Sequence, residues 1–411
     1  MRYVVVGASA AGLAAAEGTL EVNPGAEVLL LSEEPHPPYC RPLLSYRLAG
    51  KIPDSLYPLP SKALERAEVR TGSRAVHLDA AARRLTLESG EALSYDRLCL
   101  ATGAASKPLG LPGEEAANVI GFRTRADAEA VEEQISRGAR RAVVLGAGLV
   151  GVKAAGALAA RGVETLLCAA SSDPLSQSAD ERAGALVARA LEGEGVQVRF
   201  GHRPTALELR DGRAVAVRFD PPGSREPCDL VIRGKGVDPR SELLGRRGGI
   251  PADDQLRAPV PGVWVAGDAA LTHDVAWGEP RANAIWPMAV EQGRLAGRNM
   301  AGAGETYPGS LAMNSVRVGG LHLVTAGIVR PPEGEGPYRV LRREDPARGT
   351  YRKVILRDGR LVGAVFAGEA EQAGLVIAAI RAGTRLEDLP FDPLAERFHW
   401  GAYAFAGCGS R

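Results

Sequence analysis

The chain has 411 residues, 45% of them hydrophobic, and its 50 lysines and arginines nearly balance its 49 aspartates and glutamates. A chain of this length is expected to form two or three domains, since single hydrophobic cores rarely grow this large. The balanced charge gives no reason to expect nucleic acid or a membrane surface as partner. No stretch approaches the roughly 18 apolar residues of a membrane span, and no cleavable leader precedes the first strand. We therefore expect a cytoplasmic protein.

The five cysteines are scattered along the chain and show neither a C-x-x-C pair nor a metal-like Cys/His spacing. This pattern predicts no structural zinc and no iron–sulfur site, so no metal ligands are assigned. The cysteines are Cys40, Cys99, Cys168, Cys228 and Cys408.

The chain opens with MRYVVVGASAAG, a β-branched run that stops at Gly7 and leads into an Ala-rich helical pattern. A strand that turns directly into a helix offers N–H groups and the positive helix end to a pyrophosphate. Gly7 permits the tight turn, Gly12 allows close packing of helix and strand, and Ser9 stands at the middle glycine position. The next strand-like run, residues 27–32, leads to Glu33, where an acid is expected to bind a ribose hydroxyl. The pattern predicts a dinucleotide-binding unit; a plain α/β turn is the alternative.

A second glycine pattern, RAVVLGAGLVG at residues 141–151, is a full G-x-G-x-x-G between a strand and a helix. Two independent patterns imply two dinucleotides rather than one. The following strand, residues 162–168, ends without an acid, and no arginine stands ready for a 2′-phosphate. NADH over NADPH is therefore only the default, and weak affinity for the nicotinamide nucleotide is an open alternative.

Two later stretches, YDRLCLATG at residues 95–103 and PGVWVAGDA at residues 261–269, resemble signatures of the pyridine nucleotide-disulfide oxidoreductase superfamily. The resemblance reaches about residue 385. It implies an α/β fold with two Rossmann-like dinucleotide-binding domains, for FAD and NAD(P), and an α+β C-terminal domain. A hairpin with Asp358 and Gly359 at its turn belongs to that last domain. The expected domains are 1–112 with 243–305 (FAD), 113–242 (NAD(P)) and 306–411 (C-terminal).

The resemblance also implies the cofactor contacts. Asp268 is expected at the ribityl chain, and a helix opened by Pro287 points its positive end at the flavin. Trp286 either walls the ring or serves as core packing, and Arg41 either bonds a phosphate or caps the surface. The expected FAD contacts are Gly7, Ser9, Ala10, Ala11, Gly12, Glu33, Arg41, Pro42, Val76, Ala101, Thr102, Gly103, Gly267, Asp268, Trp286 and Pro287. The expected NAD(P) contacts are Gly146, Gly148, Leu149, Val150, Gly151 and Gly236.

Two positions bear on the branch of the superfamily. Lys153, where many relatives carry an acid, resembles the branch of NADH:rubredoxin reductases and the flavin domains of nitrite reductases; a solvated helix residue is the alternative. Disulfide reductases of the superfamily carry two cysteines near the first flavin-domain helix, whereas only Cys40 lies there in this chain. In the single-cysteine branch the redox cysteine falls at Pro42. The chain therefore resembles the cysteine-free electron-transfer branch, and Cys40 is kept as a candidate redox thiol.

The resemblance implies an FAD-dependent NAD(P)H oxidoreductase that passes a hydride to flavin and then electrons to a small redox protein or an iron–sulfur partner. Two alternatives stay open: an NADH oxidase or coenzyme A-disulfide-type reductase using Cys40, and a non-catalytic flavoprotein subunit with a decayed nicotinamide site. A homodimer or heteromer through the C-terminal domain is expected. The aromatic tail, residues 398–408, matches no family segment, and its composition suggests docking on this subunit or a partner.

Overall fold

The computed structural model describes all residues except 54–58, 60, 221–223, 333, 335 and 396–411. The chain divides into two compact units. The first comprises residues 1–105, 237–274 and 278–312, and the second comprises residues 106–236, 275–277 and 313–411. The division into three domains, with the boundaries expected above, stays a prediction. The aromatic tail and Cys408 lie outside the described residues.

The first unit is built on a five-stranded parallel sheet. Its strands are almost entirely apolar because helices and loops cover both faces of a parallel sheet. In spatial order the strands are β19 (Val263–Val265), β7 (Arg97–Leu100), β1 (Arg2–Val6), β2 (Glu27–Leu31) and β3 (Glu68–Arg70).

Two helices of this unit, α1 (Ala10–Val22) and α6 (Trp286–Met300), pack at backbone distance. A Cβ atom on Gly293 would lie 2.2 Å from the Ala11 carbonyl oxygen, and one on Gly297 would lie 1.9 Å from that of Ala15. Both glycines are needed because no side chain fits such a contact. Since the matched positions advance together along both helices, the helices run parallel, with α6 beginning before α1 along their common direction.

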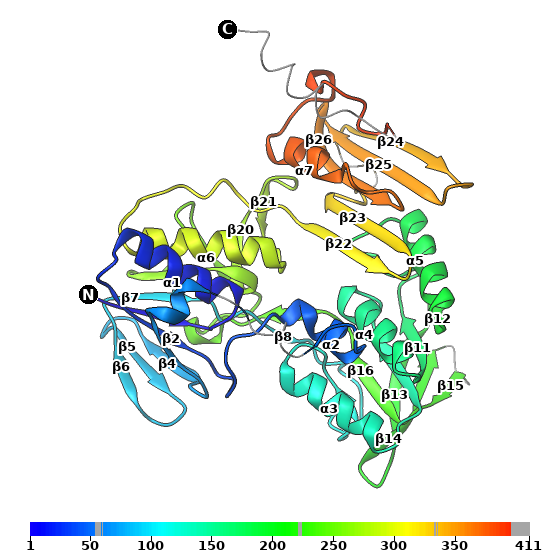
Figure 1. Cartoon of the computed structure of the whole chain (residues 1–411), viewed down its shortest axis with the longest axis horizontal. Coiled ribbons are helices and arrows are strands. Elements are labelled where there is room, and N and C mark those ends of the chain that lie inside the picture. Colours follow the sequence, from blue (N-terminus) through cyan, green and yellow to red (C-terminus); the bar gives the residue numbers. More distant parts are fainter. Residues whose placement is uncertain (54–58, 60, 221–223, 333, 335, 396–411) are drawn as a thin grey trace. The chain divides into compact units, whose positions relative to one another are not determined.

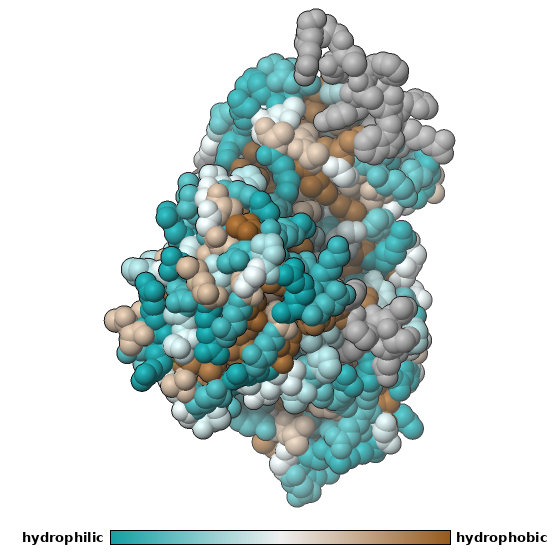
Figure 2. Space-filling model, turned by 60° about the vertical axis from the view of Figure 1, so that its left-hand side comes forward, coloured by the Kyte–Doolittle hydropathy of each residue, from teal (hydrophilic) through white to brown (hydrophobic). Residues whose placement is uncertain are grey.

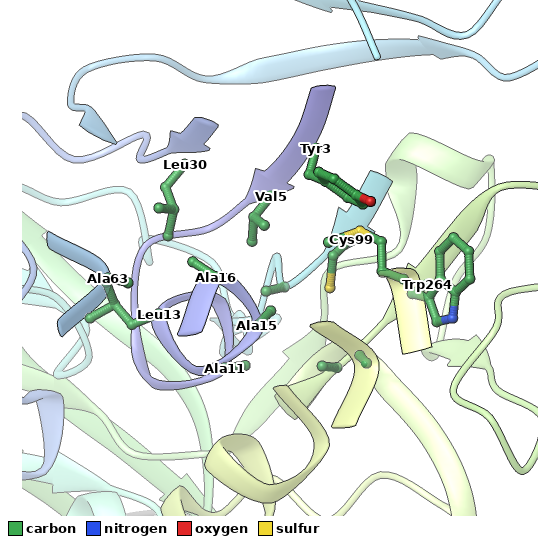
Figure 3. Close-up of a cluster of buried hydrophobic side chains, with 14 of the residues drawn as sticks. Tyr3, Val5, Ala11, Leu13, Ala15, Ala16, Leu30, Ala63, Cys99 and Trp264 are labelled. Atoms are coloured by element: carbon green, nitrogen blue, oxygen red, sulfur yellow. The ribbon is translucent and has the colours of Figure 1, made fainter. Parts of the chain in front are cut away.

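The core of the first unit joins small residues of α1 to large ones of the sheet. Figure 3 shows Ala11, Ala15 and Ala16 of α1 beside Val5 and Leu30 of the strands. Cys99 of β7 and Trp264 of β19 belong to the same cluster, which therefore joins several strands of the sheet to α1. Alanine is favoured here because it lets the helix approach the sheet closely.

Smaller elements complete the first unit. Between β3 and β7 the chain forms an antiparallel sheet of three strands. These are β4 (Ala75–Asp79), β5 (Arg84–Leu87) and β6 (Ala92–Ser94). The others are α2 (Leu44–Leu48), β8 (Ala104–Ser106), β17 (Val237–Pro239), β18 (Ile250–Pro251), β20 (Ala270–Asp274) and β21 (Glu279–Arg281).

The second unit contains another parallel sheet of five strands. In spatial order these are β12 (Val196–Phe200), β11 (Glu164–Ala169), β10 (Arg141–Leu145), β16 (Leu230–Arg233) and β9 (Val119–Ile120). Its helices are α3 (Arg125–Ser136), α4 (Leu149–Ala160) and α5 (Glu181–Gly193). A meander of β13 (Arg203–Arg210), β14 (Arg213–Asp220) and β15 (Ser224–Pro227) accompanies it.

The second unit also holds the C-terminal antiparallel sheet, which α5 contacts through β22, β23 and β26 (Figure 1). The predicted hairpin is confirmed, because Asp358 and Gly359 form its turn with φ values of 53° and 77°. In spatial order the strands are β22 (Met313–Val318), β23 (Leu321–Gly327), β26 (Arg360–Ala367), β25 (Thr350–Arg357) and β24 (Tyr338–Asp345), followed in the chain by α7 (Ala373–Arg381). The two predicted Rossmann-like sheets and the predicted α+β C-terminal part are thus confirmed.

The surface is mainly hydrophilic on the face that Figure 2 shows, with apolar residues in smaller areas between polar ones. Large apolar side chains that are exposed come from separate parts of the described chain, for example Val76, Leu209 and Val340. Among the described residues, no helix combines the length and apolar character that crossing a bilayer requires.

Candidate functional site

The first turn (residues 7–12) joins β1 to α1 and has room only for glycine at two positions. Gly7 has a φ of 113°, and a Cβ atom there would lie 2.1 Å from the Ala101 carbonyl oxygen. A Cβ atom on Gly12 would lie 1.7 Å from the Gly7 carbonyl oxygen. The first N–H groups of a helix have no acceptor within it. The start of α1 can therefore hold an anionic pyrophosphate.

The residues between these glycines leave the helix start without a side-chain cap. Ser9 is the N-cap of α1, and its hydroxyl makes no capping hydrogen bond. Ala10 and Ala11 are buried as the first helical residues. Small residues at these positions leave the backbone N–H groups uncovered, and the FAD contacts predicted for all three stay predictions.

A second backbone element, the 3₁₀ turn Gly267–Ala269 after β19, meets the start of α1. Gly267 has a φ of 76°, and a Cβ atom on it would lie 2.8 Å from the Ala11 Cβ atom. Its N–H donates to Oε1 of Gln292 at 2.9 Å, and Gln292 of α6 is buried. Asp268, half-buried in this turn, is thus held next to the start of α1 and the second turn of α6. Gln292 was not predicted; its signal in the sequence is an amide on the buried face of α6, which also carries the buried amide of Asn299.

The start of α6 carries a proline in its first turn, as predicted, while its orientation toward the flavin stays a prediction. Pro287 lies in the first turn of the helix and is exposed, and Ile285 precedes it as the N-cap. Trp286 is half-buried and packs on the core cluster of the first unit. Core packing is therefore one role of Trp286, while a role beside the flavin stays a prediction.

The A-T-G turn after β7 lies across from the first turn. Ala101 donates its N–H to the Val6 carbonyl oxygen at 2.9 Å. The Thr102 hydroxyl donates to the Arg240 carbonyl oxygen at 2.6 Å, and Gly103, with a φ of 69°, accepts from the Arg240 N–H at 2.9 Å. These bonds hold residues 101–103 in place beside Gly7.

The acid and the arginine predicted after β2 are both engaged in ion pairs. Glu33 pairs with Arg240, and each side chain is about one-third exposed (33% for both). Arg41 pairs with Glu34 and lies over the Tyr39 ring, with 5.4 Å from the guanidinium carbon to the ring centroid. A ribose bound at Glu33 would share its carboxylate with Arg240, and a phosphate bound at Arg41 would share its guanidinium with Glu34.

The other two residues predicted for FAD lie on separate elements. Pro42 sits in the 3₁₀ turn Arg41–Leu43, and Val76 is 47% exposed on β4. The structure gives each a position within the first unit, and their contacts with FAD stay predictions.

The second turn (residues 146–151) joins β10 to α4 and repeats the geometry of the first. Gly146 has a φ of 112°, and a Cβ atom on it would lie 2.5 Å from the Gly234 carbonyl oxygen. A Cβ atom on Gly151 would lie 1.8 Å from the Gly146 carbonyl oxygen. Gly148 is the N-cap of α4, which makes Leu149 and Val150 its first residues. The residues present thus fit a second dinucleotide.

The loop after β16 borders the second turn. Gly234 donates its N–H to the Leu145 carbonyl oxygen at 2.8 Å, and Lys235 donates from Nζ to that of Leu109 at 2.6 Å. Gly236 follows with a φ of 93°, a conformation that favours glycine. Its contact with the nucleotide stays a prediction.

The strand β11 ends without an acid, as the sequence indicates. Gly7 donates to the carbonyl oxygen of Leu31, and Gly146 donates equivalently to that of Cys168, both at 2.8 Å. Counting on from these matched residues, Ala170 occupies the position that Glu33 has in the first unit, and it is exposed.

The nearest acid beyond Ala170 is Asp173, which the sequence analysis did not consider. Its side chain is 10% exposed and accepts from the Ser172 hydroxyl at 2.8 Å and from Arg330 at 2.6 Å. Both carboxylate oxygens of Asp173 are therefore in use.

Lys153 and Cys40 were the two candidates for a more direct role. Lys153 of α4 donates from Nζ to the Arg317 carbonyl oxygen of β22 at 3.3 Å and is half-buried. Cys40 is half-buried, and burial raises the pKa of its thiol although a backbone hydrogen bond at Leu43 opposes the shift. A thiol with a raised pKa is mostly protonated at neutral pH and is a poor nucleophile.

Comparison with known proteins gives two family matches along the chain. Residues 1–293 match the model of the pyridine nucleotide-disulphide oxidoreductases. Residues 313–384 match that of the rubredoxin NAD+ reductase C-terminal domain.

Two curated relatives cover most of this chain. The assimilatory nitrate reductase electron transfer subunit of Bacillus subtilis is 27% identical over 90% of this chain and 48% of its own length. The NADH-dependent phenylglyoxylate dehydrogenase subunit epsilon of Aromatoleum evansii is 29% identical over 97% of this chain and 94% of its own. The chain thus spans about half of the first relative and nearly all of the second.

A solved structure with the same fold is the NAD-dependent persulfide reductase from A. fulgidus. It is 25% identical, with a TM-score of 0.88 over 97% of this chain and 80% of its own. The first family model alone covers well over half of the described sequence and both glycine turns. The chain belongs to the pyridine nucleotide-disulphide oxidoreductase family, whose cofactors are FAD and NAD(P)H.

Proposed function

We propose that this chain is an FAD-dependent NAD(P)H oxidoreductase that delivers electrons to a small redox protein or an iron–sulfur partner. The observation that carries the proposal is the pair of glycine turns of matching geometry, one in each parallel sheet. Each turn leaves space for a phosphate backbone at a helix start. Bound FAD supplies the hydride-accepting chemistry and can release electrons singly.

The residues of the first unit would hold FAD. The first turn and the start of α1 suit its pyrophosphate, and Asp268 suits a hydroxyl of the ribityl chain. The parallel start of α6 adds a second positive helix end, which favours negative charge on a reduced ring. In the second unit, the turn from Gly146 to Gly151 would bind the nicotinamide nucleotide.

The raised thiol pKa values of the buried cysteines support electron transfer rather than thiol chemistry. Burial raises the pKa of Cys99, Cys168 and Cys228 to about 12, so these thiols are inert at neutral pH. The four described cysteines are free rather than paired. The Bacillus subtilis relative is named as an electron transfer subunit, and the C-terminal part matches the rubredoxin reductase domain. Acceptors of that class are therefore the first to test.

Assembly and location are part of the same proposal. We assign subunit contacts, in a homodimer or a heteromer, to the C-terminal domain, and we expect a cytoplasmic location from the free cysteines. Light scattering of the purified chain, alone and with candidate acceptors, would measure the assembly.

Anaerobic mixing of the purified, FAD-loaded protein with NADH and with NADPH tests the function. A catalytic reductase bleaches the flavin absorbance within seconds, and reoxidation by rubredoxin, ferredoxin or other iron–sulfur proteins then identifies the acceptor. A flavin that stays oxidised with both nucleotides would contradict the proposal and favour a non-catalytic subunit. Rapid reoxidation by oxygen or by coenzyme A disulfide alone would favour the Cys40 alternative.

A further inference from the structure

The segment between β11 and α5, residues 170–180, is fastened to the second turn. The Leu175 N–H donates to the Ala147 carbonyl oxygen at 2.8 Å. Leu175 is buried and has a φ of 55°, a conformation that costs a branched side chain about 1 kcal/mol or more. Its own carbonyl oxygen accepts from the Ala179 N–H at 2.7 Å. This strained residue therefore ties the segment directly to the backbone that would cradle the nicotinamide nucleotide.

The same segment is fastened on its other side to the C-terminal sheet through Arg330. This guanidinium, which follows β23, donates to the Asp173 carboxylate at 2.6 Å and to the Ala179 carbonyl oxygen at 2.8 Å. It also pairs with Glu181, at the start of α5, at 2.7 Å. One arginine thus joins three points of the segment and the helix that follows.

A buried ion pair makes a second connection at the end of the segment. Asp180, the N-cap of α5, accepts from Nζ of Lys353 at 2.8 Å and from the Tyr351 hydroxyl at 2.6 Å. Burial by itself would raise the pKa of Asp180, but these bonds and that from the Ala183 N–H outweigh it and lower the pKa. The connection between β25 and α5 is therefore charged and fixed at neutral pH.

The two serines that follow Ala170 depend on Asp173 for their orientation. Ser172 donates to its carboxylate and Ser171 to its carbonyl oxygen, both at 2.8 Å. With alanine where the first unit has Glu33, these serines are the first polar residues that follow β11 in the chain. Arg330 compensates the buried charge of Asp173, and without it the carboxylate would have to move toward water.

We propose that Arg330 is a positioning residue for the nicotinamide nucleotide, acting from the C-terminal sheet through Asp173 and the segment 170–180. The inference rests on the proposed function of the second turn. It implies that nucleotide binding and the docking of the C-terminal sheet on α5 stabilise each other, since linkage between two sites is reciprocal.

The test uses the full-length FAD-loaded protein and NAD+ as the probe, with the dissociation constant measured by calorimetry. Arg330→Met is expected to raise the Kd of NAD+ by about tenfold, with the flavin content per protein unchanged. Arg330→Lys should recover part of the affinity. Arg343→Met is the matched control, because Arg343 is an exposed arginine of the same sheet whose ion pair with Asp392 does not touch the segment.

Hydrogen exchange gives a readout that does not depend on activity. In the wild type, NAD+ should slow exchange in residues 170–180, and Arg330→Met should speed it without nucleotide. An unchanged Kd in Arg330→Met, or an equal rise in Arg343→Met, would overturn the inference and leave the proposed function standing. A wild type that binds neither NAD+ nor NADP+ would instead overturn the proposed function and this inference with it.

Discussion

The two glycine turns have nearly the same backbone but different surroundings. Gly7 and Gly146 have φ values of 113° and 112°, and the closing glycines Gly12 and Gly151 approach them equally closely. Around the first turn, two parallel helices and the turn at Gly267 close in at backbone distance. The second turn also has a close backbone neighbour at Gly234, but its further support is the segment 170–180, which is bonded to Ala147 and held by ion pairs. We infer that close backbone packing around the first turn suits FAD, which stays bound. Support of the second turn by side chains of the segment 170–180 suits a nicotinamide nucleotide, which must exchange.

The largest effects are expected from replacing the closing glycine of either turn by alanine. Gly12→Ala places a Cβ atom 1.7 Å from a carbonyl oxygen, which should cost more than about 4 kcal/mol and yield protein without flavin. Gly151→Ala should leave the flavin bound and abolish NAD+ binding. Flavin absorbance and calorimetry measure the two effects. Gly193→Ala is the control, because its Cβ atom would meet nothing within 4 Å. Loss of flavin in Gly151→Ala would show that the turns do not act separately.

Removing the buried cation tests how the second turn is supported. Lys353→Met leaves the Asp180 carboxylate without its cation in a buried site. We expect it to lower the free energy of unfolding by about 3–5 kcal/mol, measured by urea denaturation. Arg343→Met, at an exposed pair, should change it by less than about 1 kcal/mol. Equal effects of the two substitutions would mean that burial of the pair does not matter.

A smaller change should make the second turn more like the first. Ala170→Glu places an acid where the first unit has Glu33, so it should repel the 2′-phosphate of NADP+. We expect the ratio of the NADP+ and NAD+ dissociation constants to rise about tenfold, or 1.4 kcal/mol. Ala170→Gln, of similar size and without charge, is the control. Parallel changes in both constants would rule out Ala170 as the ribose position.

The smallest effect is expected at Cys40. Because burial raises the pKa of its thiol, Cys40→Ser should leave NADH-driven dye reduction within about twofold of the wild type. Loss of reduction of a disulfide or of oxygen in this variant alone would support the thiol-dependent alternative.

The glycine spacing alone was enough to predict both turns, because a short strand-turn-helix has few solutions and the sequence signals each part of it locally. The C-terminal hairpin followed for the same reason, whereas the fold class rested on the family resemblance. The support of the second turn could not be predicted. Arg330 lies 157 positions from Asp173, and Lys353 lies 173 from Asp180. A single charged residue carries no signal of its partner over such a separation, and the pairing of Glu33 with Arg240 escaped prediction likewise.

The glycine contact between α1 and α6 has a consequence for synthesis on the ribosome. The hydroxyl of Thr19 reaches the carbonyl oxygen of Gly297, 278 positions further on, at 3.2 Å. Helix α1 can therefore pack against α6 only after almost three-quarters of the polypeptide has left the exit tunnel. The parallel sheet of the second unit is complete well before that point. Once β16 (Leu230–Arg233) has emerged from the tunnel, the nascent chain should hold the complete parallel sheet of the second unit and an incomplete first sheet, whose α1 alanines lack their α6 partner and make it a client for chaperones.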